Sequence, residues 1–313
     1  MSVVLDIVAP VFALIALGFA AGRWKLLDPV AGRGLTEFAF RLGIPALLCR
    51  TIATAKLDTL SVTELWASFY VAAIATWALA TVATRLLLKR PSADGAAIAM
   101  VATFGNTAML GLPLVLATYG QEALAPVAVI LAIHAPVLWL MGLAHSAIVG
   151  DHGGASPMRI LASVARELAQ NAIIIGIVLG ASWRLTGLEL PVAVDKTLAL
   201  VAQAGVPASL VALGLSLLSF EIKGQSATLI VVLLLKLAVM PLAAWTAATA
   251  FGLTGAALGA VVILAAMPTG ANAFLFATRE GRAVNSASGA VALGSGLAAL
   301  TSAATIALLA HPG

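Results

Sequence analysis

The chain of 313 residues is 62% hydrophobic and only 10% charged, with a formal net charge of +4. Soluble domains carry roughly a quarter charged residues, so this composition excludes an ordinary water-soluble protein and predicts a polytopic helical protein in a lipid bilayer. The basic residues are scattered at the ends of apolar runs, as expected for topology signals and not for a nucleic-acid surface, and the single cysteine, Cys49, excludes an internal disulfide.

Ten apolar runs are long enough to cross the hydrocarbon layer as helices. The first begins at Ser2 with no Lys or Arg before it, and we interpret it as a retained span and not as a cleaved signal peptide. A polar connection at 151–157 divides a single integral membrane domain into a first five-helix repeat, 1–150, and a second, 158–313. The spans are expected at 3–22, 32–54, 62–88, 95–119, 123–149, 158–183, 193–218, 226–251, 255–279 and 284–309.

The distribution of basic residues predicts the orientation in the membrane. Eleven of the 17 Lys and Arg residues fall in odd-numbered connections and four in even-numbered ones. By the positive-inside rule the odd-numbered connections are cytoplasmic, which places both termini on the non-cytoplasmic side. The eleven are Arg23, Lys25, Arg33, Arg85, Lys89, Arg90, Arg159, Arg166, Lys223, Arg279 and Arg282.

Two motifs of the first half recur in the second half in the same order. The glycine pair Gly18–Gly22, followed by a tryptophan beside a basic residue, returns as Gly176–Gly180, and Gly43-Ile-Pro45 returns as Gly205-Val-Pro207. Because each copy contains an odd number of spans, the second copy must have the opposite orientation in the membrane. Pro45 and Pro207 are candidate helix breaks or hinges in spans 2 and 7.

Span 4 combines residues that a plain membrane helix rarely combines. Gly105, Asn106, Gly111 and Pro113 fall within nine residues, and Pro113 has no backbone N–H to donate. We expect the helix to be broken or kinked near Gly111, with Pro113 opening a half-helix whose free N–H groups face the gap. A break at bilayer depth is tolerated only where protein or a watery cavity supplies hydrogen-bond partners. For this span alone, the alternative is a proline kink used for packing.

Span 9, the counterpart of span 4, contains the same kind of interruption. Pro268, Gly270 and Asn272 lie in the middle of its apolar run. Interrupted helices in matching positions of inverted repeats are typical of secondary transporters, whose substrate site lies between them at the membrane midplane.

The two interruptions together predict a site for an anion. Half-helix N–H groups, side-chain amides and hydroxyls are neutral donors, which hold an anion and still permit its release. The alternative for either asparagine is a cap on a broken helix end. The predicted substrate-binding residues are Asn106, Thr107, Gly111, Pro113, Pro268, Thr269, Gly270 and Asn272.

Four ionisable residues within spans are candidates for gating or coupling, because charge inside a membrane is costly. Glu37 and Arg41 are four residues apart in span 2 and can pair, as a gate or as a structural salt bridge. Lys236 in span 8 can place a positive charge near an anion, or its long side chain can reach the membrane surface or become neutral. His134 in span 5 can carry a proton, although a lone histidine in a helix bundle commonly only makes core hydrogen bonds.

Other classes of function lack their sequence signatures. The chain contains no HExxH, GxSxG or P-loop motif, and neither interruption carries an Asp or Glu that could hold a metal ion. We therefore expect no enzyme, no ATP-driven pump, no cofactor and no metal-binding side chains. Backbone carbonyls can bind sodium without an acidic residue, so a sodium-coupled transporter stays an alternative. A sensor would carry a soluble output domain, for which the short connections leave no room.

The segment Asn106–Leu114, NTAMLGLPL, closed by Tyr119-Gly120, resembles the first interrupted helix of the auxin efflux carrier family, and the segment Met267–Gly270, MPTG, resembles the second. This family includes plant auxin exporters and bacterial carriers of dicarboxylates such as malonate and malate. The resemblance implies ten helices in two inverted five-helix repeats, with helices 4 and 9 crossing near their prolines. It also implies elevator-like transport of an organic anion across a bacterial inner (plasma) membrane, and it admits a homodimer.

Two departures argue against a plant-type exporter. The plant proteins carry a second proline where this chain has Ala273, and their long cytoplasmic loop is replaced by the short segment 150–157. We expect a secondary-active or facilitative transporter of small organic anions, either carboxylates such as malonate and malate or auxin-like acids. The alternative within transport is a sodium-coupled organic-anion symporter of the bile-acid transporter type, which shares the inverted architecture.

Overall fold

The computed structural model describes residues 2–54, 61–149, 157–222 and 225–310, and the regular structure of these ranges is helical. Extended backbone pairs in them at one isolated β-bridge. Six helical stretches are long and apolar enough to cross a membrane, as expected for an integral membrane protein. They are Val4–Arg23, Val62–Leu86, Thr107–Val149, Val192–Leu217, Ser226–Ala250 and Val284–Ala310.

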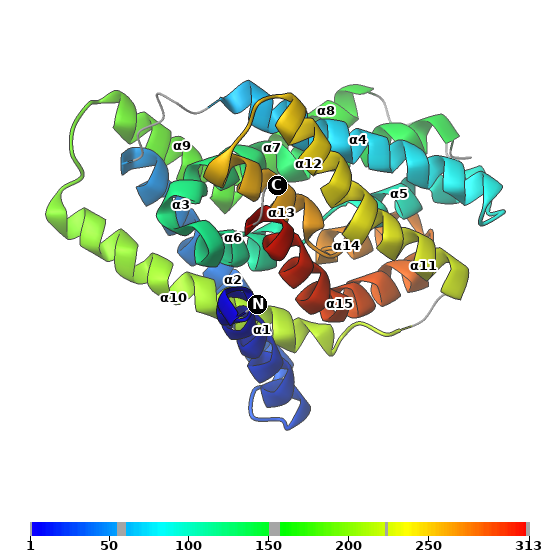
Figure 1. Ribbon diagram of the computed structural model, residues 1–313, viewed down its shortest axis with the longest axis horizontal. Helices are drawn as coiled ribbons and strands as arrows, with labels where there is room; N and C mark the ends of the chain where they lie inside the picture. The colour runs from blue at the N-terminus through cyan, green and yellow to red at the C-terminus, as the bar shows by residue number, and fades with distance from the viewer. Residues whose placement is uncertain (1, 55–60, 150–156, 223–224, 311–313) are drawn as a thin grey trace.

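One part of the molecule, which we call the panel, is built from the first helices of each predicted repeat. It lies to the left and at the bottom of Figure 1, where α10 crosses the view diagonally. Within the panel α1 packs along α10, and α9 packs along α3. The panel helices are α1 (Ser2–Arg23), α2 (Pro29–Phe38), α3 (Ile44–Thr54), α9 (Ala172–Leu185) and α10 (Val192–Leu217); α8 (Pro157–Gln170) leads into α9.

The other part, which we call the bundle, holds most of the buried core and occupies the centre and right of Figure 1. All nine residues of α5 are buried, and so is α13 from Gly259 to its end. Both helices are apolar around their whole circumference, as a helix in the centre of a membrane bundle must be. The bundle helices are α4 (Val62–Leu86), α5 (Gly95–Thr103), α6 (Leu112–Tyr119), α7 (Leu124–Val149), α11 (Ser226–Leu234), α12 (Met240–Ala250), α13 (Gly255–Ala266), α14 (Ala271–Glu280) and α15 (Val284–Ala310).

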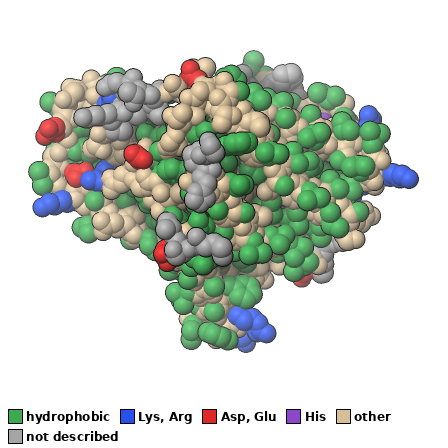
Figure 2. Space-filling model, viewed as in Figure 1, with side chains coloured by type: hydrophobic (Ala, Val, Ile, Leu, Met, Phe, Trp, Pro, Cys, Tyr) green, Lys and Arg blue, Asp and Glu red, His purple; other side chains and the backbone are tan. Residues whose placement is uncertain are grey.

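The outer surface is apolar as well. In Figure 2 hydrophobic side chains gather over the middle, right and lower parts of one face, and Lys and Arg lie at its left, right and lower ends. Because lipid tails solvate such a surface and water does not, this distribution agrees with burial of the face in a bilayer.

Glycines allow the panel helices to approach closely. Gly43 faces Gly205 of α10, and a Cβ atom on either would overlap the Cα of the other. Likewise Gly18 of α1 lies against the backbone of α10, and Gly180 of α9 lies against the backbone of α3. Helices in lipid associate through close packing of such small residues, because no hydrophobic force drives them together. The glycines of both repeated motifs therefore act as packing positions.

Three π-helical turns each end two residues before a proline. A proline ring clashes with the carbonyl four residues before it, and a wider turn with hydrogen bonds from residue i to residue i−5 accommodates the ring. In the first of them the Ile44 N–H donates to the Ala39 carbonyl. The turns are η1 (Ala39–Gly43) before Pro45, η3 (Thr107–Gly111) before Pro113 and η5 (Leu235–Val239) before Pro241.

The expected spans are not all single helices. Predicted spans 6 and 9 are each made of two helices, and the stretch Thr107–Val149 joins the second half of predicted span 4 to span 5 through Gly120, whose φ is 68°. Pro207 produces no break, because α10 continues through it as one helix. The count of ten transmembrane helices stays a prediction, and the predicted linker lies outside the described residues except for Pro157.

Gly43→Ala tests the close contact between η1 and α10. The added Cβ would overlap the Gly205 backbone, and overpacking of this kind costs about 1–3 kcal/mol. We expect a lower unfolding temperature for the purified protein in detergent, measured by thermal shift. Gly34→Ala is the matched control, because nothing lies within 4 Å of the Cβ position at Gly34. Equal unfolding temperatures for Gly43→Ala and wild type would contradict the contact.

Candidate functional site

Two interruptions of the helical backbone lie against each other in the centre of the bundle. After α5 the chain is not helical at 104–106, and after α13 it is not helical at 267–270. Within these segments Gly105 and Thr269 form the antiparallel β-bridge. We call the two segments together the junction.

Backbone hydrogen bonds join the two sides of the junction. The Asn106 N–H donates to the Pro268 carbonyl at 2.7 Å, and the Gly270 N–H donates to the Phe104 carbonyl at 2.9 Å. A Cβ atom on Gly270 would lie 3.1 Å from the carbonyl oxygen of Gly105, so a side chain here would press on the opposite segment. Glycine at this position therefore permits the bridge.

Two side chains supply donors to carbonyls that the helix ends leave without N–H partners. The Thr269 hydroxyl donates to the Val101 carbonyl of α5 at 2.8 Å, and Lys236 Nζ donates to the Ala265 carbonyl of α13 at 2.6 Å. Each interrupted helix thus receives a side-chain donor at its C-terminal end. The Thr269 hydroxyl, predicted to contact substrate, uses its proton for this structural bond.

The N–H side of the junction is different. Helical structure restarts at Thr107 in η3 and at Ala271 in α14, and the first N–H groups of a helix have no partners within it. The Asn106 side chain makes no capping bond, and Gly270 at the cap of α14 has no side chain to offer. Asn272 is exposed, in the first turn of α14. Donors therefore remain available where the two half-helices begin.

The eight predicted substrate-binding residues are distributed unevenly around the junction. Half of them form it, two lie in the first helical turns after it, and the remaining two lie further along the second half of predicted span 4. In this order they are Asn106, Pro268, Thr269 and Gly270; Thr107 and Asn272; and Gly111 and Pro113.

The break in predicted span 4 lies before Gly111 and not at it. Pro113 sits in the first turn of α6, and the π-helical turn before it continues the helix back to Thr107. Leu112 keeps right-handed helical angles, φ −59° and ψ −49°, so Pro113 does not open the half-helix. Gly111 serves packing, because a Cβ there would lie 2.7 Å from a methyl carbon of Leu264.

The break in predicted span 9 follows from Pro268 directly. Proline disfavours helical angles at the residue before it, and Met267 is extended, with φ −64° and ψ 141°. The helix therefore ends at Ala266 and restarts after Gly270.

An ion-pair cluster ties the outer ends of the two interrupted helices together. Asp94, at the start of α5, accepts from Arg90 Nε at 2.8 Å and lies 3.6 Å from Nη1 of Arg282, which follows α14. Because α5 and α14 also pack against each other, the first half of one interrupted helix is fixed beside the second half of the other.

His134 lies beside the junction. Its ring contacts Phe104 at 4.8 Å and Phe69 at 5.4 Å between centroids, and both ring nitrogens lack a hydrogen-bond partner within the described residues. It is close to the Gly105 backbone and within electrostatic range of Lys236. The described structure thus gives it no satisfied core hydrogen bond, and a role in coupling stays a prediction.

Glu37 and Arg41 lie away from the junction, and both are exposed. No ion pair joins them in the part of the chain that the structure describes; the π-helical turn η1 starts between them and removes the α-helical spacing. Pro45, which follows η1, is buried in α3.

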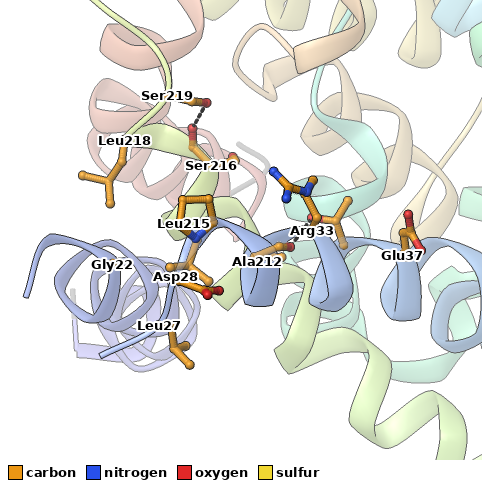
Figure 3. A pocket seen from close by; sticks show the side chains of 13 residues that line it. Gly22, Leu27, Asp28, Arg33, Glu37, Ala212, Leu215, Ser216, Leu218 and Ser219 are labelled. Atoms are coloured by element: carbon orange, nitrogen blue, oxygen red, sulfur yellow. Dashed lines mark hydrogen bonds between the residues drawn. The ribbon is translucent and has the colours of Figure 1, made fainter. Parts of the chain in front are cut away.

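A cavity of about 620 Å³ lies between the α1–α2 connection, α2 and the end of α10. Figure 3 shows Arg33 and Glu37 projecting from one side of α2 toward it. Its lining combines aliphatic residues with six polar or charged ones, and it includes no residue of the junction. We place the candidate site at the junction, because the unpartnered backbone donors are there.

Sequence reasoning did not single out the partners that close the junction. Phe104 and Gly105 pair across it, and the carbonyls of Val101 and Ala265 accept side-chain donors. The Gly105-Asn106 pair was the available signal, because these residues favour turns over helix interiors. Nothing local indicates which distant donor reaches a given carbonyl.

A largely apolar helical bundle, with two interrupted helices joined at its buried centre and donors left free there, has the features of a membrane transport protein. The chain belongs to the family described as membrane transport protein, whose model matches residues 3–306. This match confirms the resemblance to the auxin efflux carrier family and the expectation that the protein is not an enzyme.

Similar proteins carry transporter names. The chain is 24% identical over 284 residues to the "Putative malonate transporter" of Rhizobium meliloti (strain 1021), covering 90% of this chain and 88% of the relative. It is 25% identical over 278 residues to the "Uncharacterized transporter YfdV" of Escherichia coli (strain K12), covering 86% of each.

Thr269→Val tests whether the hydroxyl holds the junction closed. The change keeps the shape but leaves the Val101 carbonyl without its donor, which costs about 1–3 kcal/mol for a buried group. We expect a lower unfolding temperature in detergent, and Thr269→Ser should restore it in part. The control is Thr278→Val, whose hydroxyl is exposed and bonds within its own helix. If Thr269→Val lowered the unfolding temperature no more than Thr278→Val does, the hydrogen bond from Thr269 to the Val101 carbonyl would be contradicted.

Proposed function

We propose that the protein is a secondary transporter of a small organic anion, a carboxylate of the malonate class, bound beside the junction. Asn106, Thr107 and Asn272 would contact the substrate, together with the first N–H groups of η3 and α14. The observation that carries this proposal is the set of backbone N–H groups left without protein acceptors where the helices restart. Within the described residues, no acceptor is seen for the first N–H groups of η3 or for those of Ala271 and Asn272 in α14, which leaves them open to an anion.

The substrate class rests on the chemistry of these donors and on one relative. Amides, a hydroxyl and backbone N–H groups bind a carboxylate through charge-assisted hydrogen bonds, without the tight hold of a full ion pair. The name of the Rhizobium meliloti relative includes malonate, and that protein is similar to this chain over most of its length. Malonate is therefore the first substrate to test.

The proposed architecture is two inverted five-helix repeats, 1–150 and 158–313, whose fourth and ninth helices cross at the junction. The packing of α1 on α10 and of α9 on α3 supports it, because each pair joins a first helix of one repeat to a second helix of the other. The contact of Gly43 with Gly205 supports it further, since it unites the two copies of one motif. Movement of the bundle along the panel would carry the site across the membrane.

Uptake of radiolabelled malonate into proteoliposomes tests the function. We expect wild-type protein to accumulate malonate, and Asn106→Ala to show initial uptake roughly tenfold lower, because a hydrogen bond to a charged group is lost. Asn272→Ala should have a similar effect. A pH gradient across the liposome then shows whether protons are coupled to transport.

Asn285→Ala is the matched control for both variants, because Asn285 is exposed at the start of α15, away from the junction. All variants should keep the unfolding temperature of wild type within a few degrees if they are folded alike. Normal uptake by Asn106→Ala would contradict a substrate site at the junction. Absence of malonate uptake by wild type would contradict malonate as the substrate. A requirement for sodium would favour the symporter alternative.

We also propose that both termini face away from the cytoplasm, in a bacterial inner membrane. Single cysteines in a Cys49→Ala background test this orientation, since Cys49 is the sole cysteine. Leu188, 66% exposed between α9 and α10, is expected outside the cytoplasm, and Leu26, 73% exposed between α1 and α2, inside. A membrane-impermeant maleimide should label Leu188→Cys in intact cells, and Leu26→Cys only after permeabilisation. The reverse pattern would invert the topology.

A further inference from the structure

Lys236 is enclosed beside the junction, between the end of α13 and Gly105. The residue is 0% exposed, and its Nζ lies 2.6 Å from the Ala265 carbonyl oxygen and 3.2 Å from Met240 Sδ. The Cβ position of Gly105 is 3.3 Å from both Nζ and Cε of this lysine. One amino group therefore lies between the end of α13 and the bridge residue that follows α5.

No carboxylate pairs with this group among the described residues. The turn η5 that carries Lys236 packs against α4, α5, α13 and α15. The only Asp or Glu in these four helices is Glu64, in the first turn of α4, and no ion pair joins it to Lys236. The titratable group within electrostatic range is His134, which cannot supply a negative charge. A buried ammonium is costly without compensation, and here the C-terminal dipole of α13 provides part of it.

Several carbonyls at the two helix ends already accept hydrogen bonds from protein donors, which makes them less available to a metal cation. Hard cations require several oxygen ligands, and no cluster of three potential metal-binding side chains occurs in the described ranges. The carbonyls that accept protein donors at the two helix ends are those of Met100, Val101, Phe104, Leu264, Ala265 and Pro268.

We infer that Lys236 is a resident cation of the junction, which takes the place of a bound alkali metal ion and makes transport independent of sodium. Its ammonium group binds the end of α13, lies beside the opposite segment at Gly105, and supplies positive charge for the substrate carboxylate. The inference rests on the proposed anion transport and adds to it the source of the positive charge.

Malonate uptake by proteoliposomes tests the inference directly. Wild-type initial rates in sodium and in choline medium should agree within about twofold, and Lys236→Met should be at least about tenfold slower in both, because it fills the space without a donor or charge. For Lys236→Ala, added methylammonium should raise the initial uptake rate several-fold, whereas tetramethylammonium, which has no N–H group, should not. A strict sodium requirement in wild type, or normal uptake by Lys236→Met, would overturn the inference.

Unfolding temperatures separate this inference from the proposed function. In detergent and without substrate, wild type should unfold at the same temperature in sodium and choline buffers. Lys236→Ala should unfold at a lower temperature, and methylammonium, but not tetramethylammonium, should raise it. If wild type moves no malonate but the variant shows this amine-specific stabilisation, the proposed substrate fails and the resident cation stands. The inference would be contradicted if sodium raised the unfolding temperature of wild type, or if methylammonium did not raise that of Lys236→Ala.

Discussion

Lipid offers no hydrogen bonds, and this constraint governs the centre of the molecule. Two helices stop inside the bundle, and each stop frees backbone N–H and C=O groups that must find partners in protein. The β-bridge between Gly105 and Thr269 satisfies some of them, and the side chains of Thr269 and Lys236 reach the carbonyls of the helix ends. The buried α5 and the buried second part of α13, from Gly259 onward, bring these ends together, so the arrangement of the bundle and the junction depend on each other.

The same constraint gives the junction its chemical character. Within the described residues, the first N–H groups of the restarting helices have no protein acceptor, and the amides of Asn106 and Asn272 lie beside them. A site of this kind is electropositive without an exposed basic side chain, and Lys236 adds charge from within the protein. An anion is therefore the ligand that we propose for this site, in a chain that belongs to a family of membrane transport proteins.

The prolines show why local sequence signals gave only part of the site. Pro268 ends its helix as expected, because Met267 becomes extended before it. Pro113 has the same intrinsic properties, yet a π-helical turn accommodates it, and the break occurs earlier, before Thr107. Pro207 interrupts nothing. A proline imposes a steric problem, but the packing around it selects among a break, a widened turn and a continuous helix.

The sequence by itself determined the all-helical membrane character, the positions of most helices, and the presence of the residues at both interruptions, because apolar runs and Pro, Gly and Asn act through local physics. Tertiary structure decided that Gly105 pairs with Thr269, that Lys236 binds the Ala265 carbonyl, and that Glu37 and Arg41 stay apart. These contacts join segments far apart in the chain or depend on a turn that packing selects. Local propensity carries no information about which distant donor will reach a freed carbonyl, so only the folded arrangement settles it.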